Sequence, residues 1–171
     1  MHSNASGFMI GGGETTSTTL SGVVYLLLRH PEAIRKLMDE LRGAGVFDRG
    51  DDRISWSTLA RLKYLNACLT ETLRLFHPAA VGLPRIVPPG GAKICGNVVP
   101  EGVDSYAAGH SPLNFYHADK FRPARWFSPK TGSDMFAGDR KDAIHPFSYG
   151  PRNCIGKSKS FSDLPLQPSP R

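Results

Sequence analysis

A single cysteine stands in a bent stretch near the carboxyl end of the chain. The stretch is FSYGPRNCIG, residues 147–156, and it places Cys154 between Gly150 and Gly156, with Arg152 two residues before the thiol. Glycines allow a close backbone approach on both sides of a group, and an arginine supplies a fixed positive charge. These features favour a metal-ligating thiolate, which backbone N–H groups would tune. An inert buried thiol is the alternative that a lone cysteine favours by itself.

The ETLR stretch holds a second pair of groups that can interact. Glu71 and Arg74 stand three positions apart, so on a helix they share one side. Alone, this spacing is typical of an exposed ion pair worth about 0.3 to 0.5 kcal/mol.

Three consecutive glycines lie in GGGETT, residues 11–16, inside a helical pattern. Each glycine costs a helix about 1 kcal/mol relative to alanine, and such a broken rule often marks a functional site. A flexible amino-terminal end is the alternative. A phosphate-binding loop is disfavoured, because no GK[ST] follows and no strand precedes.

The cysteine stretch resembles the heme-binding signature of the cytochrome P450 family in every defining position, namely Phe147, Gly150, Arg152, Cys154 and Gly156. The resemblance implies heme b as the cofactor, with the Cys154 thiolate as the axial ligand of its iron. It also implies that Arg152 meets a heme propionate and that Phe147 packs beside the sulfur. A thiolate ligand pushes electron density onto iron and favours O–O cleavage.

The segment FRPARW, residues 121–126, resembles the family's aromatic-x-Pro-x-Arg-aromatic segment. In the family this arginine joins the Glu/Arg pair in a buried network beneath the heme. The resemblance therefore implies that Glu71, Arg74 and Arg125 form a structural network. Removing one partner from such a network typically costs about 3 to 5 kcal/mol.

GGGETT is similar to the family motif in the long helix that crosses the distal face of the heme. The similarity implies that small residues leave room for bound oxygen and that Glu14 and Thr15 relay protons to it, as positioned general acids do. Arg85 stands where many family members place another propionate-binding arginine.

Apolar spacing predicts three helices that would position these groups, over residues 14–29, over 31–42, and from a turn capped by Ser57 to about residue 76. Two short strands are expected at 85–87 and 92–95, about a Pro-Pro-Gly-Gly turn. A packed, irregular segment is expected over 110–146. The fold class is mainly α with a small β-sheet (α+β).

The resemblance covers nearly the whole chain but only the carboxy-terminal part of a family member. It implies a partial cytochrome P450 fold over residues 1–156, lacking the amino-terminal helices and the helix after the heme cysteine. Residues 157–171, which are rich in proline, are expected to form a disordered tail outside the family pattern.

Composition excludes several classes of function. The 171 residues carry a net charge of +6 without a Lys/Arg tract, which argues against nucleic-acid binding and fits a basic face for an acidic protein partner. Three separated cysteines without a CxxC pair argue against a disulfide framework and a zinc site, and favour a reducing compartment. The longest apolar run, Val23 to Leu28, is too short to span a membrane.

The resemblance implies an intracellular heme-thiolate monooxygenase that inserts one oxygen atom from O2 into a small lipophilic substrate, with electrons from NADPH through an NADPH-cytochrome reductase. An intact eukaryotic member would sit on the cytosolic face of the endoplasmic reticulum, held by an anchor absent from this chain. The Pro-Pro-Gly-Gly turn and the ICG stretch suggest a filamentous-fungal member acting in secondary metabolism.

Two alternatives stay open. The chain is either a competent part of such an enzyme or a catalytically incompetent, truncated heme-binding module from an incomplete gene product. A cysteine nucleophile activated by histidine would explain Cys154, but it leaves ETLR, FRPARW and GGGETT unexplained.

Overall fold

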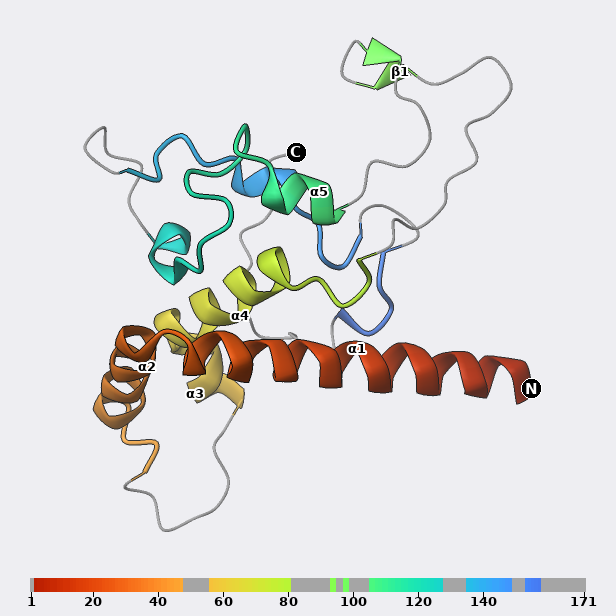
Figure 1. Cartoon of the computed structure of the whole chain (residues 1–171). Helices are drawn as coiled ribbons and strands as arrows, with labels where there is room; N and C mark the ends of the chain where they lie inside the picture. Colours follow the sequence, from red (N-terminus) through yellow and green to blue (C-terminus); the bar gives the residue numbers. More distant parts are fainter. Residues whose placement is uncertain are drawn as a thin grey trace.

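The computed structural model describes residues 2–47, 56–80, 93–94, 97–98, 105–127, 135–148 and 153–157. This part of the chain is mainly helical, as expected (Figure 1). The propionate-binding candidates Arg85 and Arg152, the glycine at position 150 and the expected tail from residue 158 onward lie outside the described residues.

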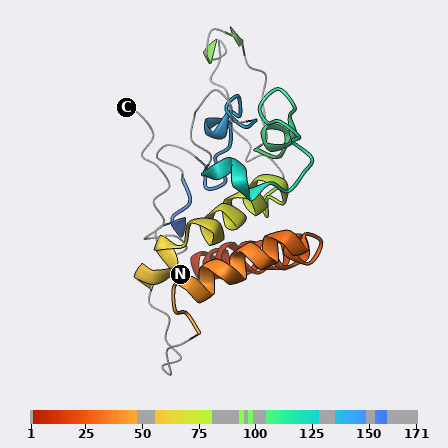
Figure 2. The same ribbon diagram turned by 90° about the vertical axis from the view of Figure 1, so that its left-hand side faces the viewer.

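The central helix is α4 (Lys63–Leu75), which contacts most of the other helical elements. On one side of it lie α1 (His2–Leu28) and α2 (Pro31–Gly43), and on the other lie α5 (Ser105–His110) and the 3-10 helix η1 (Pro123–Trp126), as Figures 1 and 2 show. Two shorter elements complete the helical part: α3 (Trp56–Arg61) and the 3-10 helix η2 (Lys141–Ala143).

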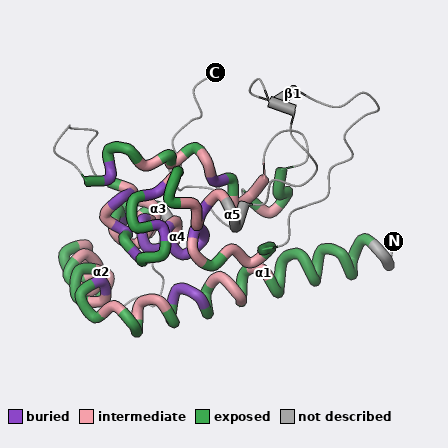
Figure 3. The backbone as a smooth tube through the Cα atoms, turned by 45° about the horizontal axis from the view of Figure 1, so that its top comes forward, coloured by how far each residue is buried: buried purple, intermediate pink, exposed green. Residues whose placement is uncertain are grey.

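The first helix is longer than expected, because α1 begins at His2 rather than at residue 14. No proline interrupts residues 2–13, and propagating an existing helix needs only one further residue to be fixed for each bond gained. The helix therefore runs through Gly11, Gly12 and Gly13 despite their low propensity. Figure 3 shows that this amino-terminal half is exposed and that burial begins only where α1 meets α4.

Close packing between α1 and α4 depends on Gly22. A Cβ atom at this position would lie 2.7 Å from Cδ1 of Phe76 and 3.3 Å from Cγ2 of Thr72. The apolar spacing of the third expected helix predicts an inner face that includes Leu62, Leu73 and Phe76. Leu62 and Leu73 are buried, whereas Phe76 is 46% exposed and covers Gly22.

The start of α4 is held by a side chain from another helix. The carboxylate of Glu40 in α2 accepts hydrogen bonds from the backbone N–H groups of Tyr64 at 2.7 Å and Leu65 at 2.9 Å. The sequence predicted a short turn capped by Ser57 that leads into a third helix ending at about residue 76. The helix is present as α4, but the expected cap is wrong, because Ser57 lies inside α3 and the chain leaves the helical conformation at Leu62. The second helix, by contrast, starts at Pro31 as expected.

Among the described residues, buried apolar side chains gather in two small clusters. Ala33, Cys68 and Phe121 form the first, with Leu26, Leu27, Tyr64 and Leu75 packed against it. The second contains Phe115, Ala118, Ile144 and the partly buried Trp126. Cys68, for which the sequence predicts the role of a small apolar packing residue, is fully buried.

The part after residue 80 matches the expectations only partly. Between residues 110 and 146 the described segments consist of turns and two 3-10 helices, as expected, whereas α5 was not foreseen. The two-residue strands β1 (Lys93–Ile94) and β2 (Asn97–Val98) pair antiparallel, with Lys93 opposite Val98. The expected strand at 85–87 and its turn lie outside the described residues. The small sheet expected from strands 85–87 and 92–95 therefore stays a prediction.

Among the described residues, we find no helix that combines the length and the apolar character needed to cross a bilayer.

Candidate functional site

The centre of the structure is a buried cluster of charges around Glu71. Arg74, one turn later on α4, donates from Nε to Oε2 at 2.9 Å and from Nη2 to Oε1 at 2.7 Å. Both side chains are fully buried. The paired N–H groups of a guanidinium match a carboxylate geometrically, so this contact is a two-pronged ion pair and not the exposed pair that the spacing alone favours.

The η1 segment brings further donors to the same carboxylate. Arg125 donates from Nε to Oε1 at 3.1 Å, the indole N–H of Trp126 donates to Oε2 at 2.8 Å, and the backbone N–H of Arg122 donates to Oε1 at 2.9 Å. Glu71 thus has a hydrogen-bond donor on every side, and the tight 3-10 turn places all three groups against it.

Arg74 uses its remaining N–H groups to hold backbone on the far side of α4. Nη1 donates to the carbonyls of Gly109 and Ala118, each at 2.6 Å, and Nη2 donates to that of Lys120 at 3.0 Å. Gly109 in α5 lies so close that an added Cβ would stand 2.7 Å from the Arg74 carbonyl oxygen. One buried arginine therefore fixes α5 and residues 118–120 to α4.

Arg125 binds a second carboxylate that the sequence did not single out. Its Nη1 donates to Oδ2 of Asp139, and its Nη2 donates to the carbonyl of Tyr116 at 3.1 Å. The guanidinium carbon also lies 4.9 Å from the ring centroid of Phe136 and 5.6 Å from that of Phe115. Such cation–π contacts add stability where water is excluded.

The sequence held a signal for this carboxylate. Two buried arginines and one glutamate leave an excess positive charge, which is costly in a protein interior. Charge balance therefore predicts a second buried acid near these groups. Between residues 127 and 146 the candidates are Asp134, Asp139 and Asp142. Within the described residues, no buried side-chain nitrogen or oxygen lacks a hydrogen-bond partner.

Cys154 lies on a turn outside the buried cluster, and its thiol is free and exposed. Its backbone N–H donates to the carbonyl of Phe147 at 2.8 Å, which ties the cysteine to the start of the signature. Ser148 adopts a left-handed φ of 61°, so the chain bends sharply directly after Phe147. A Cβ at Gly156 would lie 3.7 Å from the sulfur, an ordinary contact.

The two distal candidates lie on α1. Glu14 is exposed, and the hydroxyl of Thr15 donates to the carbonyl of Gly11 at 2.7 Å. A Cβ added at Gly11, Gly12 or Gly13 would meet nothing within 4 Å. In Figures 1 and 2 the short blue segment that holds Cys154 lies near α1.

These residues fit a heme iron better than a bare metal ion. The described part of the chain contains no group of three or more His, Cys, Asp or Glu residues placed to hold a metal. A single exposed thiol suits a metal that already has most of its ligands, which is the situation of iron in a porphyrin.

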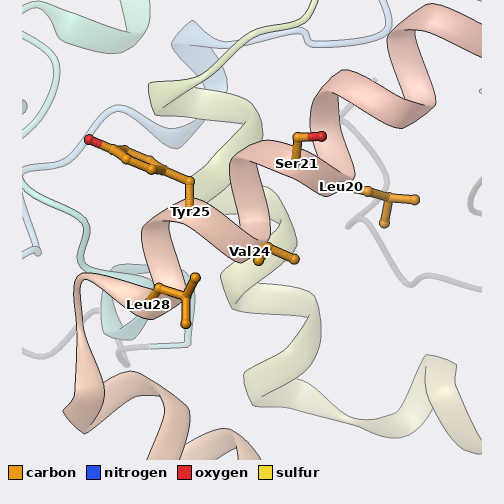
Figure 4. Close-up of a pocket in the computed structure, with 5 residues that line it drawn as sticks. All are labelled: Leu20, Ser21, Val24, Tyr25 and Leu28. Carbon is orange, nitrogen blue, oxygen red and sulfur yellow. The ribbon is translucent and has the colours of Figure 1, made fainter.

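The surface of α1 also has a depression, lined by residues that follow Glu14 and Thr15 in the sequence. It is lined by one face of the helix, as Figure 4 shows, and contains none of the predicted site residues; the lining residues are Leu20, Ser21, Val24, Tyr25 and Leu28.

The family model of cytochrome P450 matches residues 1–159. The chain belongs to the cytochrome P450 family. It is 49% identical to cytochrome P450 monooxygenase AMT3 of Alternaria alternata over 95% of this chain and 33% of that protein. It is 45% identical to cytochrome P450 monooxygenase efuB of Hormonema carpetanum over 97% of this chain and 32% of that protein. For cytochrome P450 monooxygenase FUM2 of Gibberella moniliformis the identity is 42%, over 97% and 35%. The chain thus spans about a third of the length of these cytochrome P450 relatives.

Proposed function

We propose that the chain is the heme-proximal part of a heme-thiolate monooxygenase that inserts one oxygen atom from O2 into a small lipophilic substrate. The family match over residues 1–159 and relatives named as monooxygenases support this function. The observation that carries it is the exposed Cys154 thiol, held on a sharp turn by the hydrogen bond from its own N–H to Phe147.

The proposal assigns heme b to Cys154. When bound, the heme supplies an iron that activates O2, and a thiolate ligand favours cleavage of the O–O bond. Cys154 provides that ligand, while Phe147, Gly150 and Gly156 shape its loop. Arg152 and Arg85 bind the propionates, because a guanidinium matches a carboxylate with two parallel hydrogen bonds.

Thr15 and Glu14 handle protons in this proposal. The Thr15 hydroxyl donates to the Gly11 carbonyl, and rotation about its side-chain torsion frees the same proton for another acceptor. Glu14 is exposed, one residue before it, and exchanges protons with water. Gly11, one turn before Thr15 on the same face of α1, has no side chain that would fill the space beside the hydroxyl.

The buried cluster serves as the rigid support of the site. Glu71, Arg74 and Arg125 join α4, α5 and η1 through fully buried charge-assisted hydrogen bonds. Such contacts are stronger than neutral hydrogen bonds and fix geometry. A loop anchored to them keeps its shape when the ligand bond forms.

Electrons come from NADPH through an NADPH-cytochrome reductase in this proposal, and the intact protein works at the endoplasmic reticulum membrane in fungal secondary metabolism. The domain is the carboxy-terminal part of the cytochrome P450 fold, with a small sheet, to which residues outside this chain add the amino-terminal helices and the helix after the cysteine. Nucleic acid is not a partner.

The share of its relatives' length that the chain spans supports a second candidate, a heme-binding module without turnover. Substrate-dependent NADPH consumption in the presence of a reductase separates the two, because only a competent enzyme couples electron flow to a substrate.

The ligand assignment is tested by adding hemin to the 171-residue chain, reducing it and adding carbon monoxide. We expect the strongly red-shifted absorption band of a thiolate-ligated heme, lost in Cys154→Ser and kept in Cys95→Ser, which removes a different thiol. An identical spectrum in Cys154→Ser would reject the assignment.

A further inference from the structure

We propose that Asp139 is a positioning residue that couples the buried charge cluster to the loop carrying Cys154. The functional meaning of this coupling rests on the proposed heme site, whereas the contacts that produce the coupling are made by protein groups alone. Asp139 lies in the 135–148 segment, which leads directly into the cysteine signature.

Asp139 closes a ring of hydrogen bonds with two partners. Its Oδ1 accepts the backbone N–H of Tyr116 at 2.7 Å, and its Oδ2 accepts Nη1 of Arg125. Arg125 in turn donates from Nη2 to the carbonyl of Tyr116 at 3.1 Å. Because all three sides are fixed, the 135–148 segment cannot shift along the 115–118 turn without breaking a charge-assisted bond.

The charge of Asp139 is also needed for balance. The side chains of Arg125 and Asp139 are 0% and 1% exposed. With Asp139 the cluster holds two arginines and two carboxylates, and without it one buried positive charge has no counterpart. A buried charge left without its partner destabilises whatever holds it there, so the position of the segment depends on this contact.

Further contacts hold the residues between Asp139 and the cysteine signature against the rest of the protein. Directly after Asp139, the N–H of Arg140 donates to the Asn114 carbonyl at 2.7 Å, and Ile144 is then buried against Phe115 and Ala118. These contacts hold the residues that follow Asp139 in place up to the start of the signature.

The last steps involve His77, which follows α4. Its Nε2 lies 3.2 Å from the carbonyl oxygen of Pro146, within hydrogen-bond distance. The next carbonyl, that of Phe147, accepts the N–H of Cys154. The segment to which Cys154 is hydrogen-bonded is therefore held at one end by Asp139 and at the other end by His77.

The test compares Asp139→Asn with the matched control Asp142→Asn, which removes an exposed carboxylate three residues away. Asparagine keeps the shape and the acceptor oxygen but removes the charge. Amide hydrogen exchange is measured on the full chain without heme. We expect exchange at the Tyr116 and Cys154 amides to rise by about tenfold or more in Asp139→Asn, with α2 amides and the control unchanged.

Faster exchange at Tyr116 alone would overturn the coupling to the cysteine, and equal acceleration in α2 would show a loss of global stability instead of positioning. If Asp139→Asn unfolds the chain, the Arg125→Gln/Asp139→Asn double variant is measured, because it restores the charge balance. A folded double variant with fast exchange at Cys154 supports the proposal, and slow exchange there overturns it.

Hemin gives an independent reading of the same variants. At equal bound heme, Asp139→Asn should hold a smaller share in the thiolate-ligated form than Asp142→Asn, and equal shares would contradict the positioning role. If hemin binds to neither variant nor to the unaltered chain, the proposed heme site fails, while the exchange result still decides the role of Asp139.

Discussion

At the scale of single residues, Glu71 is the acceptor shared by every donor at the centre of the molecule. Two arginines, an indole and a backbone N–H all point at its carboxylate. Glu71 is fully buried, so water cannot take its place as the acceptor when the charge is lost.

We therefore expect Glu71→Gln to lower the free energy of unfolding by about 3 to 5 kcal/mol, because Arg74 and Arg125 would keep only one carboxylate between them. Urea unfolding followed by circular dichroism measures the change. Asp39→Asn, on the exposed face of α2, is the control and should leave the midpoint in place. A loss for Glu71→Gln as small as that of the control would contradict the buried network.

Cys68 gives a prediction for alkaline pH. Burial, followed by the nearby carboxylates of Glu40 and Glu71, raises the pKa of its thiol from 9.0 to about 12. The unfolded chain loses this proton first, so the contribution of the neutral thiol to stability is complete below pH 9 and is lost as the pH rises towards 12.

Between pH 8 and pH 10 the free energy of unfolding should thus fall by about 1.4 kcal/mol more in the unaltered chain than in Cys68→Ala. Tyr64, whose pKa burial raises from 10.0 to about 12, begins to contribute only at the upper end of this window, and it does so in both proteins. Parallel pH profiles for the two proteins would show that Cys68 ionises as freely in the folded chain as in the unfolded one.

The resemblance to the cytochrome P450 family pointed to three of the four charged members of the cluster, Glu71, Arg74 and Arg125, whereas the spacing in ETLR alone favoured an exposed ion pair. The structure brings the three side chains together. Asp139 was missed because its partner is fourteen positions away and no spacing rule joins a turn residue to a 3-10 helix. Charge balance predicts a second buried acid, but it does not distinguish Asp139 from Asp134 and Asp142.

At the scale of elements, the attachment of α2 to α4 depends on Glu40. Helix amino termini expose N–H groups with no partner in their own helix, and α4 has no side-chain cap of its own. Glu40 supplies both acceptors from another helix and also places negative charge at the positive end of the helix dipole.

Replacing Glu40 by alanine should cost about 0.5 to 2 kcal/mol of unfolding free energy, the usual range for a lost amino-terminal cap. Thermal unfolding compared with Lys36→Ala, an exposed change in the same helix, isolates the cap from helix propensity. Equal midpoints in the two variants would mean that water replaces the carboxylate without loss.

Helix boundaries were predictable only where the chain itself marks them. His30-Pro31 separates α1 from α2 because proline fits a first helical turn and lacks the N–H that a helix interior requires. The break at Leu62 has no such local signal: it depends on Glu40, which lies 24 residues before Tyr64. Contacts of this kind arise only once α2 and α4 are packed.

At the scale of the whole molecule, two layers of the structure serve different parts of the proposed site. The buried cluster on one side of α4 fixes the segment that leads to Cys154, and α1 on the other side carries Glu14 and Thr15 (Figure 1). The proposed site needs both layers, because in the proposal one layer carries the thiolate ligand and the other carries the groups that donate protons.

The central claim is that the sulfur of Cys154 binds heme iron directly, and iron-edge X-ray absorption of the hemin-loaded chain tests it without relying on turnover. We expect a sulfur atom among the nearest neighbours of the iron, replaced by a lighter atom in Cys154→Ser and kept in Cys95→Ser. A nearest-neighbour shell of nitrogen and oxygen alone, the same in all three proteins, would contradict the claim.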